Sequence, residues 1–192
     1  MINRLDLPAE VAIECAKHPN IVGMKESGGD VTKIGMIMSG TNNNPKNFCV
    51  LAGATTFLLP ASQVGSNGAV CGLGNMIPDE CCKLQNFIGK FSPNFNLYPP
   101  YSFNVIVFLF KVKSPLILIL ENGQLEEAMK LEHRLMNIQL AVMKYNTGIL
   151  FVKAAMDWFQ GYYGGPTRKP LLPLDEKSLD GLKRAFIDNG FL

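Results

Sequence analysis

The chain has 192 residues, of which 47% are hydrophobic and 18% are charged, and its formal net charge is +2. This length and composition suffice for a globular domain with a core and exclude a chain that is disordered throughout. The charges are interspersed without a basic stripe, so the sequence gives no electrostatic reason to expect nucleic acid as a partner.

The cysteines are odd in number and lack the C-x-x-C or Cys/His spacing of a metal site. They are Cys15, Cys49, Cys71, Cys81 and Cys82. We expect reduced packing residues in an intracellular protein. Acidic residues, namely Asp6, Glu10 and Glu14, interrupt the opening segment early, so neither a secretory nor a transit peptide is predicted there.

The first predicted element is a helix over 6–17, with Asp6 as its cap and Pro8 in its first turn. The short apolar run 21–24 follows, and it is typical of a buried strand in a parallel α/β sheet. Asp30 is then expected to cap a second helix. The buried face of that helix is predicted to hold Val31, Ile34, Ile37 and Met38.

Two more strands are predicted over 48–52 and 68–72. Each is followed by a helical segment, a short apolar one over 55–64 and a second one that begins near Pro78. Strand and helix therefore alternate three times, which favours an α/β fold of parallel βα units. Their loops would gather at the carboxyl ends of the strands.

Residues 91–120 break this pattern, because they are apolar without helical periodicity and contain several prolines. They fail as a membrane span, since Lys111, Lys113 and Pro115 interrupt them before roughly 20 apolar residues accumulate. An extra hairpin is one interpretation, and sequence foreign to the fold is the favoured one. After Gly123 the remaining signal is helical, in three segments that end near Thr147, Gly161 and Gly190.

Lys25 is the residue on which the predicted chemistry depends. With the period of two of a strand, Ile21, Gly23 and Lys25 share one face, and Lys25 lies at the strand's carboxyl end. A lysine held in a buried place loses solvation, which lowers its pKa and leaves a free amine that attacks ketones to form an imine. The alternative is an ordinary solvated lysine at a strand end.

Several motifs together resemble the class I aldolases of the dihydrodipicolinate synthase and N-acetylneuraminate lyase family. They are Gly-Met-Lys-Glu-Ser-Gly-Gly-Asp at 23–30, Val-Leu-Ala-Gly at 50–53, Gly-Ala-Val-Cys at 68–71 and Gly74-Asn75. Within the family, the motifs at 133–135, 156–159 and 162–171 resemble most closely the branch that cleaves 4-hydroxy-2-oxoglutarate. Motifs spread over separate segments are more specific than any single one.

The resemblance implies a partial (β/α)8 TIM barrel, consisting of its last three βα units, followed by C-terminal helices. Residues 1–90 would be the barrel part, 91–120 an insertion foreign to the family pattern, and 121–192 a C-terminal helical region. A full barrel takes about 250 residues. The family's early substrate-carboxylate loop and its proton-moving tyrosine have no counterpart here, so we expect a truncated or alternatively assembled gene product.

By the same resemblance, Lys25 corresponds to the imine-forming lysine and Ser27 to a substrate-contacting serine. Gly53 corresponds to a position where the backbone approaches the substrate. Their alternatives are structural: a turn-forming serine before two glycines, and a turn that ends a strand. Asn75 is expected to cap a loop rather than to contact substrate. None of the five tyrosines matches the missing one; they are Tyr98, Tyr101, Tyr145, Tyr162 and Tyr163.

The implied activity is a lyase that cleaves 4-hydroxy-2-oxoglutarate to pyruvate and glyoxylate, impaired by truncation, with no metal or organic cofactor. A related pyruvate-dependent lyase, similar to dihydrodipicolinate synthase, is one alternative. Another is an inactive fragment that associates with full-length aldolase subunits through its helices. A small 2-oxo acid is the expected ligand, a homotetramer the expected assembly and the mitochondrion the expected location, with no nucleic acid or membrane partner.

Overall fold

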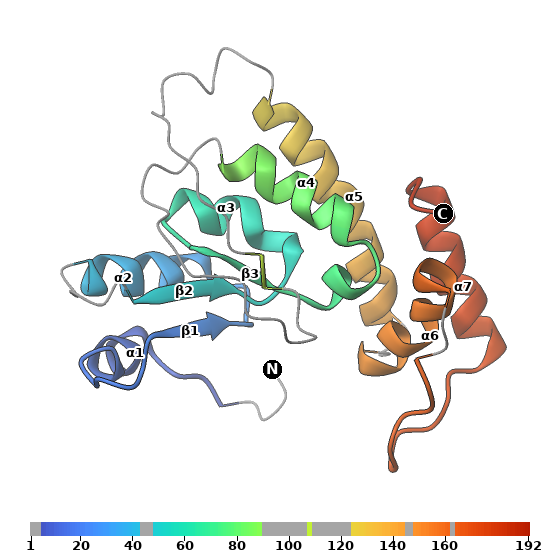
Figure 1. Ribbon diagram of the computed structural model, residues 1–192, viewed down its shortest axis with the longest axis horizontal. Coiled ribbons are helices and arrows are strands. Elements are labelled where there is room, and N and C mark those ends of the chain that lie inside the picture. Colours follow the sequence, from blue (N-terminus) through green and yellow to red (C-terminus); the bar gives the residue numbers. More distant parts are fainter. Residues whose placement is uncertain (1–4, 43–47, 90–106, 109–123, 145–147, 162–163) are drawn as a thin grey trace.

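The computed structural model describes residues 5–42, 48–89, 107–108, 124–144, 148–161 and 164–192 (Figure 1). The first part alternates helices and strands, and the last part is helical. In chain order the elements are α1 (Ala9–Cys15), β1 (Gly23–Glu26), α2 (Val31–Thr41), β2 (Cys49–Ala52), η1 (Thr55–Phe57), α3 (Leu58–Gln63), β3 (Gly68–Val70), η2 (Gly72–Asn75), α4 (Pro78–Gly89), β4 (Val107–Phe108), α5 (Gln124–Lys144), α6 (Gly148–Gln160) and α7 (Glu176–Asp188).

The strands form one sheet in the order β1-β2-β3-β4. β1, β2 and β3 are parallel, with Lys25 opposite Leu51 and Leu51 opposite Gly68. β4 pairs with β3 in the antiparallel direction. The predicted parallel βα units are therefore confirmed. The predicted segment 91–120 and the boundary at residue 90 lie outside the described residues, except for 107–108 in β4.

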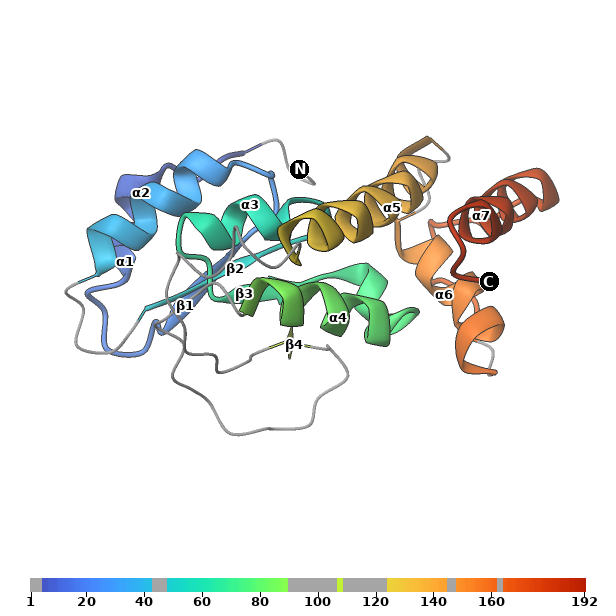
Figure 2. The same ribbon diagram turned by 90° about the horizontal axis from the view of Figure 1, so that it is seen from above.

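One face of the sheet is covered by helices, because α2 packs against β2 and α3 packs against β3 (Figures 1 and 2). On that face Val50, Ala52 and Ala69 are fully buried. The alternate residues of β2, Cys49 and Leu51, are only half-buried. A strand alternates its side chains between two faces, so the second face of this sheet carries Lys25 and has less cover.

The structure corrects the predicted start of the first strand, since β1 begins at Gly23 and not at Ile21. Ile21 and Val22 are exposed, the latter to 55%, and neither lies within β1. β1 is an outer strand of the sheet among the described residues, since β2 alone pairs with it there. The apolar pattern predicted a strand, but burial of a strand also requires a neighbour on each side.

Asp6 does not cap the first helix, which is a second correction. α1 begins at Ala9 with Pro8 as its cap residue, and no side chain accepts a hydrogen bond there. Asp6 instead pairs with Lys33, at 2.7 Å between Oδ1 and Nζ. Asp30 caps α2 as predicted, because its side chain accepts the backbone N–H of Lys33.

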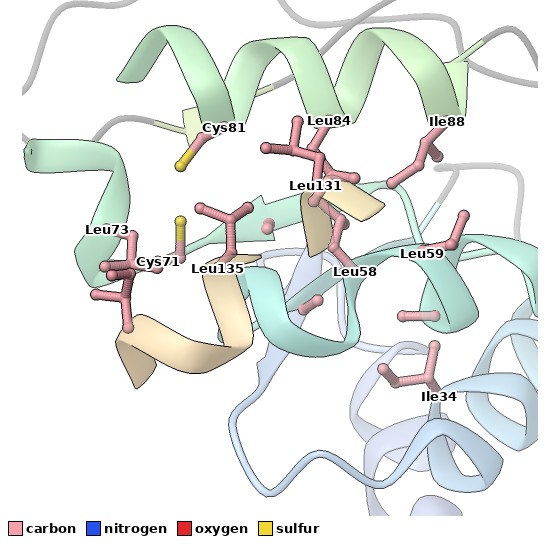
Figure 3. Packing of buried hydrophobic residues seen from close by; sticks show 14 of the residues in the cluster. Ile34, Leu58, Leu59, Cys71, Leu73, Cys81, Leu84, Ile88, Leu131 and Leu135 are labelled. Atoms are coloured by element: carbon pink, nitrogen blue, oxygen red, sulfur yellow. The ribbon is translucent and has the colours of Figure 1, made fainter. Parts of the chain in front are cut away.

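The core lies between the helices and the sheet, where α4 and α5 pack on each other and α5 packs on α3 (Figure 3). It is built from apolar side chains of these and neighbouring elements. The residues labelled in Figure 3 are Ile34, Leu58, Leu59, Cys71, Leu73, Cys81, Leu84, Ile88, Leu131 and Leu135. This packing joins the sheet part of the chain to its helical part.

The last helices lie at the end of the molecule opposite α1 and β1 (Figures 1 and 2). Phe186 of α7 is fully buried, with its ring 4.8 Å from that of Phe159 and 5.7 Å from that of Phe151. The guanidinium of Arg134 in α5 donates to the carbonyl of Asn189 and stacks on Phe191. These contacts fasten α7 to α5 and α6.

No helix in the described ranges has both the length and the apolar character that a membrane span requires.

Candidate active site

The three residues predicted for the site lie at the carboxyl ends of two neighbouring parallel strands. Lys25 is the last residue but one of β1 and pairs with Leu51 of β2. Ser27 follows β1 directly. Gly53 follows β2, whose last residue Ala52 pairs with Glu26. Parallel strands present their carboxyl ends on one side of a sheet, which is where α/β proteins place their sites.

Ser27 and Gly53 are in direct contact. A Cβ atom placed on Gly53 would lie 2.5 Å from the Ser27 hydroxyl oxygen and 2.6 Å from the carbonyl oxygen of Glu26. Glycine is therefore required here by close approach of two chain segments, rather than by an unusual backbone conformation. The substrate contacts predicted for Ser27 and Gly53 stay predictions.

Replacing Gly53 with alanine is expected to lower the free energy of unfolding by about 1–3 kcal/mol, because the new methyl group overpacks against backbone and Ser27. Gly72→Ala is the matched control, since a Cβ there meets only a Val152 methyl group, at an ordinary 3.6 Å. Urea unfolding of both variants measures the difference. Equal stability for the two variants would contradict the close contact of Gly53 with Ser27.

Lys25 is exposed, which corrects the prediction that the strand end buries it. No described strand lies on the free side of β1, so none covers Lys25 from that side. The amine is therefore presented to solvent at the edge of the sheet.

Glu26 is a residue that the prediction of the site missed. It is only 4% exposed, although it stands between exposed Lys25 and exposed Ser27. Its carboxylate accepts the backbone N–H groups of the turn that follows: Gly28 at 2.7 Å, Gly29 at 2.7 Å and Asp30 at 3.2 Å. The sequence held a signal, since strand periodicity puts a carboxylate on the same face as Met24, two residues before a pair of glycines.

The cysteines near the strands behave as packing residues, as predicted. Burial raises the pKa of the Cys49 thiol to about 11. Cys71 and Cys81 are both buried, and their sulfur atoms point toward each other (Figure 3). Their mutual hydrogen bond lowers the pKa of Cys71 and raises that of Cys81. Cys15 is different, because it is exposed.

Two further expectations concern other groups. Asn75 donates from Nδ2 to the carbonyl oxygen of Gly72, which is the loop-capping role predicted for it. The five tyrosines all lie outside the described residues. Among the residues that are described, no group of three or more His, Cys, Asp or Glu side chains is placed to hold a metal ion.

Residues 3–89 match the model of the Dihydrodipicolinate synthetase family. The match takes in less than half of the chain and shows that this part is similar to that family. The matched range contains Lys25, Ser27 and Gly53, and the three parallel strands.

Curated relatives are similar to the chain over part or most of its length. The chain is 36% identical over 81 residues to the 4-hydroxy-tetrahydrodipicolinate synthase of Methanosarcina barkeri, covering 42% of this chain and 27% of that protein. It is 28% identical over 185 residues to the enzyme of that name from Methanoculleus marisnigri, covering 96% of this chain and 51% of the relative. The chain thus spans about half the length of the second relative and a smaller share of the first.

Solved structures of the dihydrodipicolinate synthetase family share the fold. YagE, a prophage protein of this family from E. coli K12 in complex with pyruvate, superposes with a TM-score of 0.71 at 17% identity. The superposition covers 97% of this chain and 52% of YagE. The predicted fold class, α/β with part of a TIM barrel followed by helices, is confirmed.

Proposed function

We propose that the site is that of a class I lyase, which cleaves 4-hydroxy-2-oxoglutarate to pyruvate and glyoxylate through an imine on Lys25. The observation that carries the proposal is the gathering of Lys25, Ser27 and Gly53 at adjacent strand ends, within the segment that matches a pyruvate-dependent lyase family. The narrower choice of substrate rests on the resemblance of the motifs in the helical half.

The chemistry follows from the amine. Lys25 attacks the 2-oxo carbon and water leaves, giving an iminium that draws electrons from the bond between carbons 3 and 4. That bond breaks as the 4-hydroxyl loses its proton, which releases glyoxylate and leaves an enamine. Protonation at carbon 3 and hydrolysis then release pyruvate and the free lysine. Ser27, two residues after Lys25, is the group proposed to donate a hydrogen bond to the substrate carboxylate.

A turnover assay tests the substrate. Purified chain is incubated with 4-hydroxy-2-oxoglutarate, and pyruvate and glyoxylate are measured separately. We expect both products in equal amounts, at a rate lowered by the exposure of Lys25. Pyruvate consumption with other aldehydes, without glyoxylate release from 4-hydroxy-2-oxoglutarate, would favour the alternative of a related pyruvate-dependent lyase. The names of the curated relatives support that second candidate.

A third candidate is an inactive fragment that joins full-length aldolase subunits through its helices. Its support is a set of exposed apolar side chains, Leu140 and Met143 near the end of α5 and Ile149 near the start of α6, which are 63%, 67% and 66% exposed. Such a surface favours association. This candidate is supported if the chain co-purifies with a full-length subunit and shows no turnover of its own. We propose a tetramer as the assembly, from the resemblance. Mitochondrial location is likewise a proposal from the resemblance.

A further inference from the structure

Glu26 and Lys33 form a buried charge pair beneath the site. Glu26 is 4% exposed and Lys33 is 8% exposed, and Lys33 Nζ lies 3.3 Å from Glu26 Oε1. The same Nζ donates to Asp6, and that hydrogen bond raises the pKa of Lys33. Buried charges persist in proteins where they are paired and hydrogen-bonded, and Glu26 and Lys33 meet both conditions.

Each carboxylate oxygen of Glu26 has its own donors. Oε1 accepts from the N–H of Gly28 and forms the ion pair with Lys33, whereas Oε2 accepts from the N–H groups of Gly29 and Asp30. An amide has one acceptor oxygen and one NH₂ group. In a Glu26→Gln variant, either orientation of the amide would therefore point NH₂ at N–H donors.

The turn held in this way contains Ser27. On one side Ser27 follows the ladder between β1 and β2, and on the other it precedes amides that are bound to Glu26. Its hydroxyl lies against Gly53. The backbone on both sides of Ser27 is fixed, and Lys25 is the neighbour of Glu26 within the same short strand.

We propose that Glu26, with Lys33 as its counter-charge, is a positioning residue for imine formation. It fixes the turn that contains Ser27 and the backbone of Lys25. This inference rests on the proposed function. Glu26 acts through the turn, and its own oxygens are occupied by backbone amides. Displacement of reacting groups by about 1 Å is enough to slow a reaction by up to roughly a hundredfold.

The test compares Glu26→Gln with Glu14→Gln, which removes the same charge from an exposed glutamate of α1. Two quantities are measured on protein shown to be folded by circular dichroism. One is amide hydrogen exchange at Gly28 and Gly29. The other is the rate at which pyruvate is trapped on Lys25 by borohydride.

In Glu26→Gln we expect exchange at these amides and trapping at Lys25 to change by roughly tenfold or more, the first faster and the second slower. Glu14→Gln is expected to match the unmodified chain in both. A fall in thermal stability with an unchanged trapping rate would mean that Glu26 has a structural role alone, and it overturns the inference.

The same measurements distinguish failure of the proposed function from failure of this inference. If the unmodified chain traps no pyruvate, the lyase proposal fails, and unchanged exchange at Gly28 and Gly29 in Glu26→Gln then overturns the hold of Glu26 on the turn as well. If Glu26→Gln does not fold, Glu26→Asp is measured by the same two readouts, because it keeps the charge and shortens the reach. Normal exchange and trapping in that variant would contradict the positioning role.

Discussion

Incubation of the chain with pyruvate, followed by borohydride, is expected to leave a reduced adduct on Lys25. Borohydride converts the imine to a secondary amine, which survives digestion and is located by peptide mass spectrometry. The reason for selectivity is the neighbourhood of Lys25, which has Ser27 and Gly53 at the adjacent strand ends. Lys25→Ala is expected to lose the adduct completely.

Exposure alone is the competing explanation, because Lys25 is exposed and any exposed amine reacts slowly with a ketone. Lys17 provides the control, since it is also exposed and lies two residues after the end of α1, away from the predicted site residues in the sequence. We expect Lys17→Ala to retain the full yield of adduct. Adducts spread evenly over Lys17, Lys25 and Lys130 would show reaction by exposure, and the proposed role of Lys25 would be wrong.

The adduct also separates the candidate functions. An adduct on Lys25 without release of glyoxylate from 4-hydroxy-2-oxoglutarate would place the defect after imine formation, in breaking the carbon–carbon bond. That step needs a base for the 4-hydroxyl proton. Absence of an adduct from soluble, folded protein would favour the inactive fragment, for which Lys25 is an inherited residue without a reaction.

The sequence predicted the features that depend on neighbouring residues alone, such as strand ends, helix caps and the buried face of a helix. The apolar run before Lys25 and the glycines after it predicted a strand end, and β1 ends at Glu26. Asp30 was predicted to cap α2 because an Asx side chain accepts amides of the first turn, and its oxygen does accept Lys33 N–H. Ile34 and Ile37 follow helical spacing and are fully buried.

Burial and long-range pairing could not be predicted in this way. Whether Lys25 is buried depends on a strand beside β1, and the pattern of residues within one strand carries no information about its neighbours. Asp6 has the chemistry of a helix cap, but its partner is Lys33, 27 positions along the chain. Strand periodicity puts Glu26 on the face opposite to that of Lys25, yet its hydrogen bonds depend on how the following turn folds back.

A second large effect is expected at Glu132, a buried glutamate that joins α5 to α3. It is 4% exposed, and its Oε1 accepts the backbone N–H of Leu59 at 2.8 Å. Burial raises the pKa of Glu132 to about 7, although hydrogen bonds from the N–H groups of Leu59 and Leu58 act in the opposite direction. The helical half of the chain therefore meets the sheet half through a carboxyl group that titrates near neutrality.

Because the folded state holds this proton more tightly than the unfolded chain, the contribution of Glu132 to stability is fully present below pH 4.5 and is lost as the pH rises to about 7. The loss is on the order of 1–3 kcal/mol in the free energy of unfolding. Glu132→Gln keeps a carbonyl oxygen for Leu59 N–H but cannot ionise, so we expect its stability to lack this decline. Urea unfolding at pH 5 and pH 8 measures the difference.

Glu127→Gln is the matched control, because Glu127 is an exposed glutamate of the same helix. Its stability is expected to fall between pH 5 and pH 8 as much as that of the unmodified chain. Glu132→Ala is expected to be less stable at both pH values by about 1–3 kcal/mol, since a buried N–H then has no acceptor. A pH dependence that survives unchanged in Glu132→Gln would mean that this carboxyl ionises without cost. The junction between α5 and α3 would then depend on its apolar packing, with Glu132 contributing only an acceptor.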